Sequence, residues 1–433
     1  MNIFQQRRER LYQDFDQQSV IIIVGNTQKV RSKNIKYHFR PDNDLFYYTG
    51  FEEPNAVAVL RPHHKEPFAM FVRGKDVAAE VSFGERAGEL GVQEKFGADI
   101  AYDIEKVYTV LPHLLEERTK VYYLDEQEEY ANNILSWIAH QRRNTGFDVI
   151  KHYRQLLPFQ PYIHNQRVIK DEVEISRIRH AVEASVHAHK QVMKKCRPGM
   201  NEGQLAALFD FEIASFGCKE VSYPSIVAGG RNGCCLHYEN NNCELNNGEM
   251  LLIDAGAEYQ YYCADITRTY PINGKFSDAQ KTIYQLVLLA LDSAISNIKP
   301  GVSWNGIYQT CVEVMTKGLI ELGILKCSFE QAIASEAYRK FTVHKTGHWL
   351  GMDVHDVGAY HDAKGEWRLL QENMVFTVEP GIYIPEDCLD VEEKWRGIAV
   401  RIEDDILVTA DGCENLSSGV PRTVEEIEAW MAD

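Results

Sequence analysis

HKTGHWLGMDVHDVG, residues 344–358, is the stretch on which the interpretation of this chain depends. It contains two aspartates and three histidines, His344, His348 and His355. Such a stretch is either a polar loop beside a buried apolar pair, Trp349 and Leu350, or one part of a metal site. Ligands elsewhere in the chain decide between these two interpretations.

The composition is that of a soluble globular protein. A length of 433 residues predicts two or three domains, and 45% hydrophobic with 25% charged residues is typical of a folded chain. A net charge of −17 argues against nucleic acid as a partner. The aliphatic run at residues 20–24 is far too short to span a membrane. Because residues 1–15 lack the apolar core of a signal peptide, we expect a cytoplasmic protein.

The first part of the chain follows an α/β pattern. Four runs, SVIIIVGN, AVAVLRP, FAMFVRG and KVYYLDE, are predicted strands between turn residues and amphipathic segments. Residues 156–172, LLPFQPYIHNQRVIKDE, are rich in proline and long polar residues and are interpreted as the interdomain connection. We therefore expect an N-terminal α/β domain at residues 1–165 and a catalytic domain at residues 166–433.

The second part contains a weak internal duplication. A helix that ends at Pro198-Gly199 is followed by another that Asn201 caps, with Gln204 completing a capping box. A hundred residues later a helix ends at Pro300-Gly301, and Ser303 is predicted to cap the next one. A β-rich segment follows each pair, so we expect two related halves with a cleft between them.

Candidate ligands occur in both halves. If Tyr259-Gln260 is a two-residue turn in LLIDAGAEYQYYCADITRT, Asp254 lies directly opposite Asp265 across a hairpin. Cross-strand Cβ atoms are about 5 Å apart, and two carboxylates at that range repel each other unless a proton or a cation lies between them. A bulge at Gly256 would shift this register.

In the second half, Glu379 ends an apolar strand before Pro380-Gly381. In AVRIEDDI the strand alternation places Arg401 and Glu403 on one face, an expensive arrangement in a buried strand without a partner. Asp404 and Asp405 are interpreted as ordinary strand-end residues. The candidate ligands are then four carboxylates and one imidazole: Asp254, Asp265, His348, Glu379 and Glu403.

This ligand set favours two divalent ions over one. Four negative charges balance two doubly charged cations with a hydroxide between them, as in a two-metal hydrolase. An oxygen-rich set with one imidazole suits manganese better than a structural zinc ion. The ten cysteines form no C-x-x-C pair and are assigned no chemistry.

These residues, in this order and in these contexts, resemble the metallopeptidases with the pita-bread fold, a family that includes methionine aminopeptidase, prolidase and Xaa-Pro aminopeptidase (aminopeptidase P). The stretch at 344–358 looks like the signature of the proline-directed members, and TVEPGIY and RIEDDI match the later ligand motifs. FRPDNDLFYYTGFEEPNAVAVL, residues 39–60, resembles the N-terminal domain of aminopeptidase P. The resemblance implies a ribonuclease H-like, creatinase-type α/β domain followed by an α+β pita-bread domain with pseudo-twofold halves.

The resemblance also implies roles for individual residues. Asp254 chelates one ion, Asp265 and Glu403 bridge both, and His348 with Glu379 completes the other. His237, in NGCCLHYENN, lies near the scissile bond, His344 and His355 flank the substrate, and Arg401 braces the carboxylates beside it. Lys345 is a departure, because many relatives carry Gly, Ser or Arg there; its effect is left open.

The expected function is release of the first residue from peptides with proline in second position. Hydroxide activated by two manganese ions attacks the carbonyl before proline, Glu379 shuttles the proton, and His237 or His355 helps to hold the oxyanion. The alternatives are a prolidase, restricted to X-Pro dipeptides, a metal-free creatinase-like enzyme, and a non-catalytic peptidase-like binding domain. The complete ligand set disfavours the last two. Self-association into a dimer or tetramer, through the N-terminal domain, is also expected.

Overall fold

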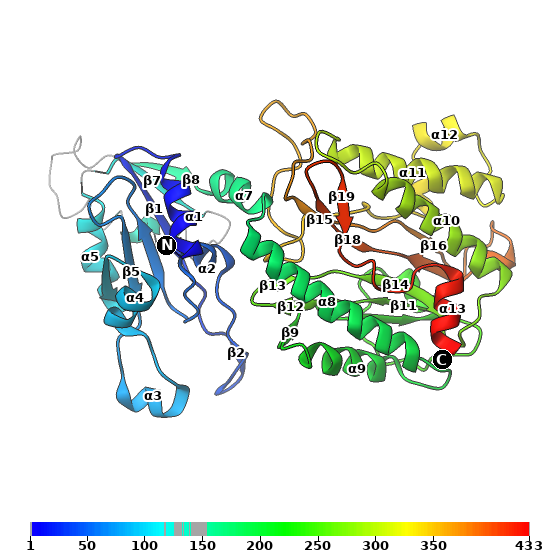
Figure 1. Cartoon of the computed structure of the whole chain (residues 1–433), viewed down its shortest axis with the longest axis horizontal. Helices are drawn as coiled ribbons and strands as arrows, with labels where there is room; N and C mark the ends of the chain where they lie inside the picture. Colours follow the sequence, from blue (N-terminus) through cyan, green and yellow to red (C-terminus); the bar gives the residue numbers. More distant parts are fainter. Residues whose placement is uncertain are drawn as a thin grey trace. The chain divides into compact units, whose positions relative to one another are not determined.

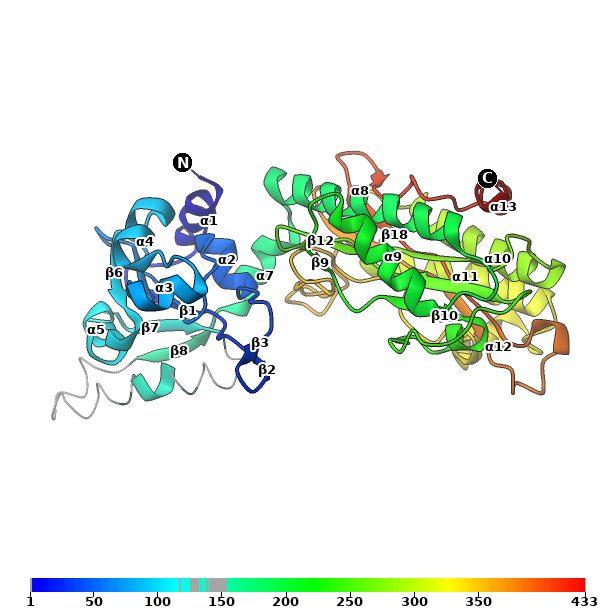
Figure 2. The same ribbon diagram turned by 90° about the horizontal axis from the view of Figure 1, so that it is seen from below.

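The computed structural model describes residues 2–116, 118–124 and 154–432, together with 132, 134–137 and 139 between them. Within it the chain divides into two units, which we call unit 1 (Met1–Asn165) and unit 2 (Gln166–Asp433). Figures 1 and 2 show the elements of each unit in two orthogonal views.

Unit 1 is built on a mixed six-stranded sheet. The four runs predicted as strands form β1, β4, β5 and β7. The order across the sheet is β6 (Ile100–Asp103), β5 (Phe68–Val72), β4 (Val57–Leu60), β1 (Ser19–Val24), β7 (Lys120–Tyr123) and β8 (Gln155–Pro158). Val20 and Ile22 of β1 pack with Leu111 of α5 (Val107–Leu114) in one core cluster. Ile21 and Ile23, which point to the opposite face, are also buried, so side chains cover both faces of the sheet.

The remaining described elements of unit 1 are short. They are α1 (Ile3–Tyr12), the hairpin β2 (Val30–Ser32) and β3 (Ile35–Lys36), α2 (Asn43–Thr49), α3 (Val77–Phe83), α4 (Gly88–Phe96) and α7 (Gln160–Val168). The expected interdomain connection at residues 156–172 therefore contains most of a strand, β8, and a helix, α7, which crosses the boundary between the units.

Unit 2 contains the two expected helix pairs. They are α8 (Glu172–Lys195) with α9 (Glu202–Ala214), and α10 (Asp278–Ile295) with α11 (Trp304–Glu321); the members of each pair pack against each other (Figure 1). The capping box of Asn201 and Gln204 is present as predicted. Ser303 occupies the N-cap position of α11, but its side chain makes no capping hydrogen bond.

Antiparallel strands follow each helix pair. In the first half, one sheet has the order β10 (Ile226–Gly229), β11 (Met250–Asp254), β14 (Thr267–Pro271), and another the order β13 (Tyr262–Cys263), β12 (Ala257–Tyr259), β9 (Glu220–Val221). In the second half the orders are β15 (Val375–Val378), β18 (Asp404–Val408), β19 (Cys413–Asn415), and β16 (Gly381–Ile384), β17 (Ile398–Arg401). The other α-helices described in the unit are α12 (Phe329–Ala334) and α13 (Val424–Ala432).

The predicted hairpin register is wrong by one residue at the turn. Tyr259 pairs with Tyr262, so the turn residues are Gln260 and Tyr261, with φ of 47° and 69°. Two successive left-handed residues make the tight turn that matches the twist of a hairpin. Asp254 consequently lies opposite Thr267 and not opposite Asp265. Because Asp265 is two residues from Thr267, it still occupies the same face as a diagonal neighbour of Asp254.

A buried ion pair joins the two halves of unit 2. Arg268 of β14 donates to Asp404 of β18 at 2.6 Å and to the Glu403 carbonyl at 2.7 Å, and both charged side chains are fully buried. Asp404 and Asp405 are therefore not ordinary strand-end residues: both have 0% exposure. Among the residues described, no helix is long and apolar enough to cross a membrane.

Candidate metal centre

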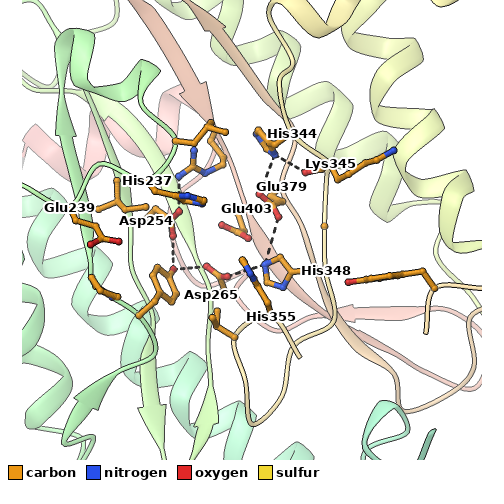
Figure 3. A pocket seen from close by; sticks show the side chains of 18 residues that line it. His237, Glu239, Asp254, Asp265, His344, Lys345, His348, His355, Glu379 and Glu403 are labelled. Atoms are coloured by element: carbon orange, nitrogen blue, oxygen red, sulfur yellow. Dashed lines mark hydrogen bonds and ion pairs between the residues drawn. The ribbon is translucent and has the colours of Figure 1, made fainter. Parts of the chain in front are cut away.

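All nine site residues predicted from the sequence line one cavity of about 530 Å³ in unit 2. They are Asp254, Asp265, His348, Glu379, Glu403, His237, His344, His355 and Arg401. Figure 3 shows the four carboxylates and His348 directed toward the centre of this cavity from both halves of the unit. The structure therefore brings every one of them together.

Strand ends position the carboxylates. Asp254 is the last residue of β11, and Glu379 follows β15 directly, while Glu403 lies between β17 and β18. Apolar residues such as Ile253, Val378 and Ile402, all with 0% exposure, anchor the chain beside them. The core therefore fixes the backbone, and the polar side chain is presented where each strand stops.

His348 comes from the loop at residues 344–358 and lies at the middle of the cluster. Its Nε2 atom lies 3.3 Å from Asp265 Oδ2 and 3.7 Å from Glu379 Oε1. Asp265, His348 and Glu403 each offer one ligand atom, and these three atoms all lie within 4.8 Å of one another. Trp349, which follows His348, is fully buried and stacks on Tyr360 with an interplanar angle of 8°. Leu350 is also fully buried, so the apolar pair that follows the histidine packs into the core.

Hydrogen bonds from neighbouring side chains orient the carboxylates. Tyr223 Oη lies 2.5 Å from both Asp254 Oδ1 and Asp265 Oδ1. Arg401 donates to Asp254 Oδ2 at 2.6 Å, and the Thr267 hydroxyl donates to Glu403 Oε2 at 2.6 Å. Each carboxylate so held keeps a second oxygen or lone pair for another ligand.

The donor set fits a divalent cation. Burial raises the pKa of Glu379 to about 7, although the charges of His348 and Arg401 oppose the shift, and burial also raises the pKa of Asp265. Burial lowers the pKa of His348, but the hydrogen bond and charge of Asp265, together with Glu379, outweigh it and raise that pKa to about 9. Four crowded carboxylates with one cationic arginine thus favour additional positive charge.

The other histidines lie around this cluster. His344 is bonded to Tyr383 Oη at 2.8 Å, and burial, with the charge of Arg401, lowers its pKa to about 4. The His355 ring lies 4.2 Å from that of His348, and partial burial and the charge of His348 lower its pKa. His237 is an exposed side chain on the opposite wall (Figure 3).

The loop that carries His237 is anchored by a buried carboxylate, Glu202. Its Oε1 accepts hydrogen bonds from the Gly229 amide and the Asn232 side chain, and its Oε2 accepts from Tyr238 and the Cys243 amide. Because Tyr238 directly follows His237, these four bonds hold the loop on both sides of that histidine.

Two tyrosines were not predicted from the sequence. Tyr223 links Asp254 to Asp265, and Tyr383 links His344 to Arg401 through bonds of 2.8 Å each. Tyr223 precedes Pro224 near the start of a strand, and Tyr383 lies inside one, where an aromatic residue is ordinary. The sequence therefore carries no signal that distinguishes either from a packing residue.

Comparison with known proteins identifies the family. The model for metallopeptidase family M24 matches residues 176–410, and the model for the aminopeptidase P N-terminal domain matches residues 4–123. The chain belongs to metallopeptidase family M24. A curated M24 relative, Xaa-Pro aminopeptidase of Escherichia coli (strain K12), is 40% identical over 432 residues, which are 99% of this chain and 97% of that protein. Xaa-Pro aminopeptidase 3 of Homo sapiens is 35% identical over 94% of this chain and 80% of its own length.

The fold of this chain is also similar to the folds of solved aminopeptidase structures. The aminopeptidase PepP of Pseudomonas aeruginosa superposes with a TM-score of 0.95 at 42% identity, covering 99% of this chain and 97% of that one. A zinc-substituted E. coli aminopeptidase P in complex with product also gives 0.95, at 40% identity over 99% and 98% of the two chains.

These findings confirm the resemblance to aminopeptidase P, the α/β plus pita-bread fold, and a hydrolase that uses a divalent metal. The M24 chain is of the aminopeptidase P type, and prolidase is not favoured.

Proposed function

We propose that this metallopeptidase releases the N-terminal residue from peptides that carry proline in second position. The observation that supports the proposal most directly is the gathering of Asp254, Asp265, Glu379 and Glu403 around His348 in one cavity. Such a cluster attracts the free α-amine of a peptide, and the imidazoles around it can contact the first peptide bond. Bacterial relatives named Xaa-Pro aminopeptidase, which are 34–40% identical to this chain, support the choice of substrate.

We propose that two divalent ions, manganese in preference to zinc, bind between the halves. Asp254 would hold one ion, Asp265 and Glu403 would bridge both, and His348 with Glu379 would complete the second. The oxygen-rich donor set with a single imidazole supports manganese. When bound, the ions supply a water of lowered pKa and withdraw charge from the scissile carbonyl.

The side chains around this centre have separate tasks in the proposed mechanism. Glu379 accepts the proton of the attacking water and passes it to the leaving proline nitrogen. His237 and His355 donate hydrogen bonds to the carbonyl oxygen as it becomes negative. His344, held by Tyr383, flanks the substrate, and Arg401, bonded to Asp254, keeps that carboxylate in place beside it.

A bond before proline suits this kind of centre. The X-Pro bond is a tertiary amide without an N–H, so peptidases that recognise that N–H discriminate against it. Here the contacts go to the α-amine and to the carbonyl oxygen, and neither contact needs the missing N–H.

The test uses the purified full-length protein. After treatment with a chelator it should release no alanine from Ala-Pro-Ala, and manganese should restore release, with metal analysis giving two ions per chain. Ala-Pro serves as the dipeptide comparison and Ala-Ala-Ala as the proline-free one. Activity that survives chelation, or that is confined to Ala-Pro, contradicts the proposal. A chain that binds Ala-Pro-Ala but never cleaves it would instead be a binding domain.

We also propose a cytoplasmic homo-oligomer, a dimer or tetramer, without a nucleic-acid partner. The net charge of −17 supports the last point. Exposed apolar side chains on α3 of unit 1, Val77, Val81 and Phe83, at 78%, 85% and 77% exposure, support an interface between copies. Light scattering tests the oligomeric state, and a mass near 50 kDa contradicts self-association.

A further inference from the structure

A polar cavity of about 400 Å³ lies within unit 1. Basic side chains dominate its lining: two arginines, Arg61 and Arg118, and three histidines, His63, His64 and His113. Among the described residues that line it, Glu116 is the one acidic residue. Every residue with a role in the proposed function belongs to unit 2, so the peptidase reaction leaves this cavity unexplained.

Three neighbouring strands bring the two arginines together. Arg61 directly follows β4, Arg118 lies shortly before β7, and Gln18, which also lines the cavity, directly precedes β1. Because β1 pairs antiparallel with β4 and parallel with β7, the end of β4 and the beginnings of β1 and β7 meet at one edge of the sheet. The sheet of unit 1 therefore fixes the backbone on which both arginines stand.

Main-chain carbonyl groups orient Arg118, which is 9% exposed. Its Nη1 donates to the carbonyl oxygens of Gln17, Ser19 and Pro62, at 3.4 Å for Ser19 and 3.3 Å for Pro62. Neutral carbonyl groups of this kind fix the direction of a guanidinium but do not cancel its charge.

Arg61 is buried with most of its donors unused. It is 6% exposed, and its Nη2 donates to the Glu66 carbonyl oxygen at 2.6 Å. Its Nε is buried and has no hydrogen-bond partner in the described part of the chain. A guanidinium carries five N–H donors, so this side chain retains donors for a ligand in the cavity that it lines.

The surroundings of Arg61 favour an added negative charge. Burial lowers the pKa of this guanidinium, and the charge of Arg118 adds to the shift, although the charge of Glu66 opposes it. A buried positive charge beside a second one costs free energy unless an anion compensates it. A ligand with several negatively charged oxygens would compensate both arginines at once.

The histidines add donors above these two arginines. His63 Nε2 is bonded to the Phe15 carbonyl at 2.8 Å, and His64 Nδ1 to the main chain of Glu66, so each ring keeps its second nitrogen for a ligand. Glu116 is paired with His113 at 3.0 Å, and both of these side chains are exposed. The acidic residue therefore lies at the rim, with a basic partner of its own.

The chemistry of the cavity excludes other ligand classes. Among the described residues, the group whose ligand atoms converge for a metal ion is Asp265, His348 and Glu403, and not these histidines. No Phe, Tyr or Trp occurs among the described lining residues, so a nucleobase would have no ring on which to stack. Two guanidinium charges match a phosphate group, with a charge of about −2 near neutral pH, better than they match one carboxylate.

We propose that this cavity binds a phosphate group, either as inorganic phosphate or in a small phosphate ester. Arg61 and Arg118 bind its oxygens from the buried floor, and His63 and His64 bind them from the side. The inference does not depend on the proposed peptidase function, because all four residues belong to unit 1.

The test is calorimetric titration of inorganic phosphate into the full-length protein near neutral pH and at constant ionic strength. Arg61→Met removes a charged hydrogen-bond donor and should raise the Kd by about tenfold or more. Arg61→Lys keeps the charge without the planar set of donors and should give an intermediate Kd. His64→Ala should raise the Kd about threefold. Because His64 is only partly buried, this variant tests the site even if Arg61→Met fails to fold.

Arg8→Met is the matched control. Arg8 is also a buried arginine of unit 1, at 4% exposure, and its Nη1 donates to the Tyr48 carbonyl at 2.6 Å, but it does not line this cavity. Its Kd for phosphate should stay within about twofold of the wild-type value, because distant sites without shared partners act independently.

Two further probes identify the ligand. Methyl phosphate that binds as tightly as inorganic phosphate supports a site for phosphate esters, and methyl phosphate that binds much more weakly supports a site for the free anion. Acetate that displaces phosphate at equal concentration overturns the proposal, because the cavity would then not distinguish a phosphate group from a carboxylate.

The variants decide where phosphate binds. Phosphate held by metal ions in unit 2 would be insensitive to Arg61→Met and His64→Ala, and that result overturns the site in unit 1. Absence of any binding to the wild type also overturns it, while release of alanine from Ala-Pro-Ala stays unaffected by either outcome. A loss of affinity in the Arg61 and His64 variants, but not in Arg8→Met, supports the proposal.

Discussion

Tyr223 is the clearest example of a single side chain that organises this site. Its hydroxyl reaches one oxygen of Asp254 and one of Asp265, and burial raises its pKa well above the ordinary value, with the two carboxylates adding to the shift. The phenol therefore remains protonated and able to donate. It donates its one proton to either carboxyl group and contacts both, so it fixes their separation before any ion arrives.

The first prediction concerns this hydroxyl. Because partners that orient metal ligands commonly contribute 10- to 100-fold to affinity, Tyr223→Phe should weaken manganese binding by about that factor. Calorimetric titration of metal into the stripped protein measures it. Tyr262→Phe is the control, since Tyr262 also contacts a buried carboxylate, Glu174 at 3.2 Å, but does not line the metal cavity. Equal affinities in both variants would contradict the role of Tyr223.

The second prediction concerns pH and His189. This side chain has 0% exposure, its Nε2 donates to the Ala255 carbonyl at 2.9 Å, and burial lowers its pKa to about 4 from 6.5. The unfolded chain therefore binds a proton between these values that the folded chain does not. The free energy of unfolding should fall as pH decreases from 6.5 through 4, by about 3 kcal/mol at most.

Urea unfolding of the metal-free protein from pH 4 to 7 measures this dependence. In His189→Gln, where the amide can still donate to Ala255, this part of the decline should disappear. If the free energy of unfolding falls by the same amount in the wild type and in His189→Gln between pH 7 and pH 4, His189 is not the cause of the decline.

The sequence predicted the charged side chains of the site best, because burying a charged group without a partner costs free energy. The four carboxylates were named because acidic groups in or beside apolar strands are expensive to bury, His348 was named from the histidine-rich stretch 344–358, and Arg401 shares a strand face with Glu403. All six line the metal cavity. Their individual roles remain predictions. Tyr223 was missed because a tyrosine beside a strand is stable with or without a polar partner.

At the scale of elements, the helices were easier to predict than the hairpin. Helix ends depend on local signals, and the capping box at Asn201 formed as expected. The hairpin turn depends on which two residues adopt positive φ, and Gln260 and Tyr261 are not residues that favour it. The pairing of β11 with β14 sets the register of the hairpin and therefore which residues form the turn. The residues paired there lie several positions away from the turn.

The third prediction concerns the ion pair between β14 and β18. Removing one member of a buried pair leaves an uncompensated charge, so Arg268→Leu should lower the free energy of unfolding by about 3–5 kcal/mol. Replacing Asp404 by Leu in the same chain should recover part of this loss. The control is Arg179→Leu, which breaks an exposed pair with Glu414 and should cost less than about 1 kcal/mol. Similar losses in the two single variants would contradict the argument.

At the scale of the whole molecule, the order of elements could be predicted, because alternating strands and helices precede two repeated helix–strand segments. The connection at residues 156–172 differs from a plain linker. Its composition, rich in proline and long polar residues, suggested an interdomain connection, yet β8 (Gln155–Pro158) adds the sixth strand to the sheet of unit 1. An edge strand tolerates proline, which is why composition alone misleads here.

The fourth prediction is that metal stabilises the fold. Each ion present at 100 times its dissociation constant should add about 2.7 kcal/mol to the free energy of unfolding. Calorimetry should therefore show a higher Tm for the manganese-loaded protein than for the chelated one. Asp265→Asn should reduce the response. A Tm that manganese does not alter would count against a centre formed by both halves.

The division of the ligand set between the halves has a consequence for synthesis of the protein. Asp254 and Asp265 leave the ribosome long before Glu379 and Glu403, which belong to the other half. A growing chain can therefore assemble neither the ion-binding centre nor a functional peptidase until most of unit 2 has been translated and paired. The division of the ligands thus delays peptidase activity until synthesis of unit 2 is nearly complete.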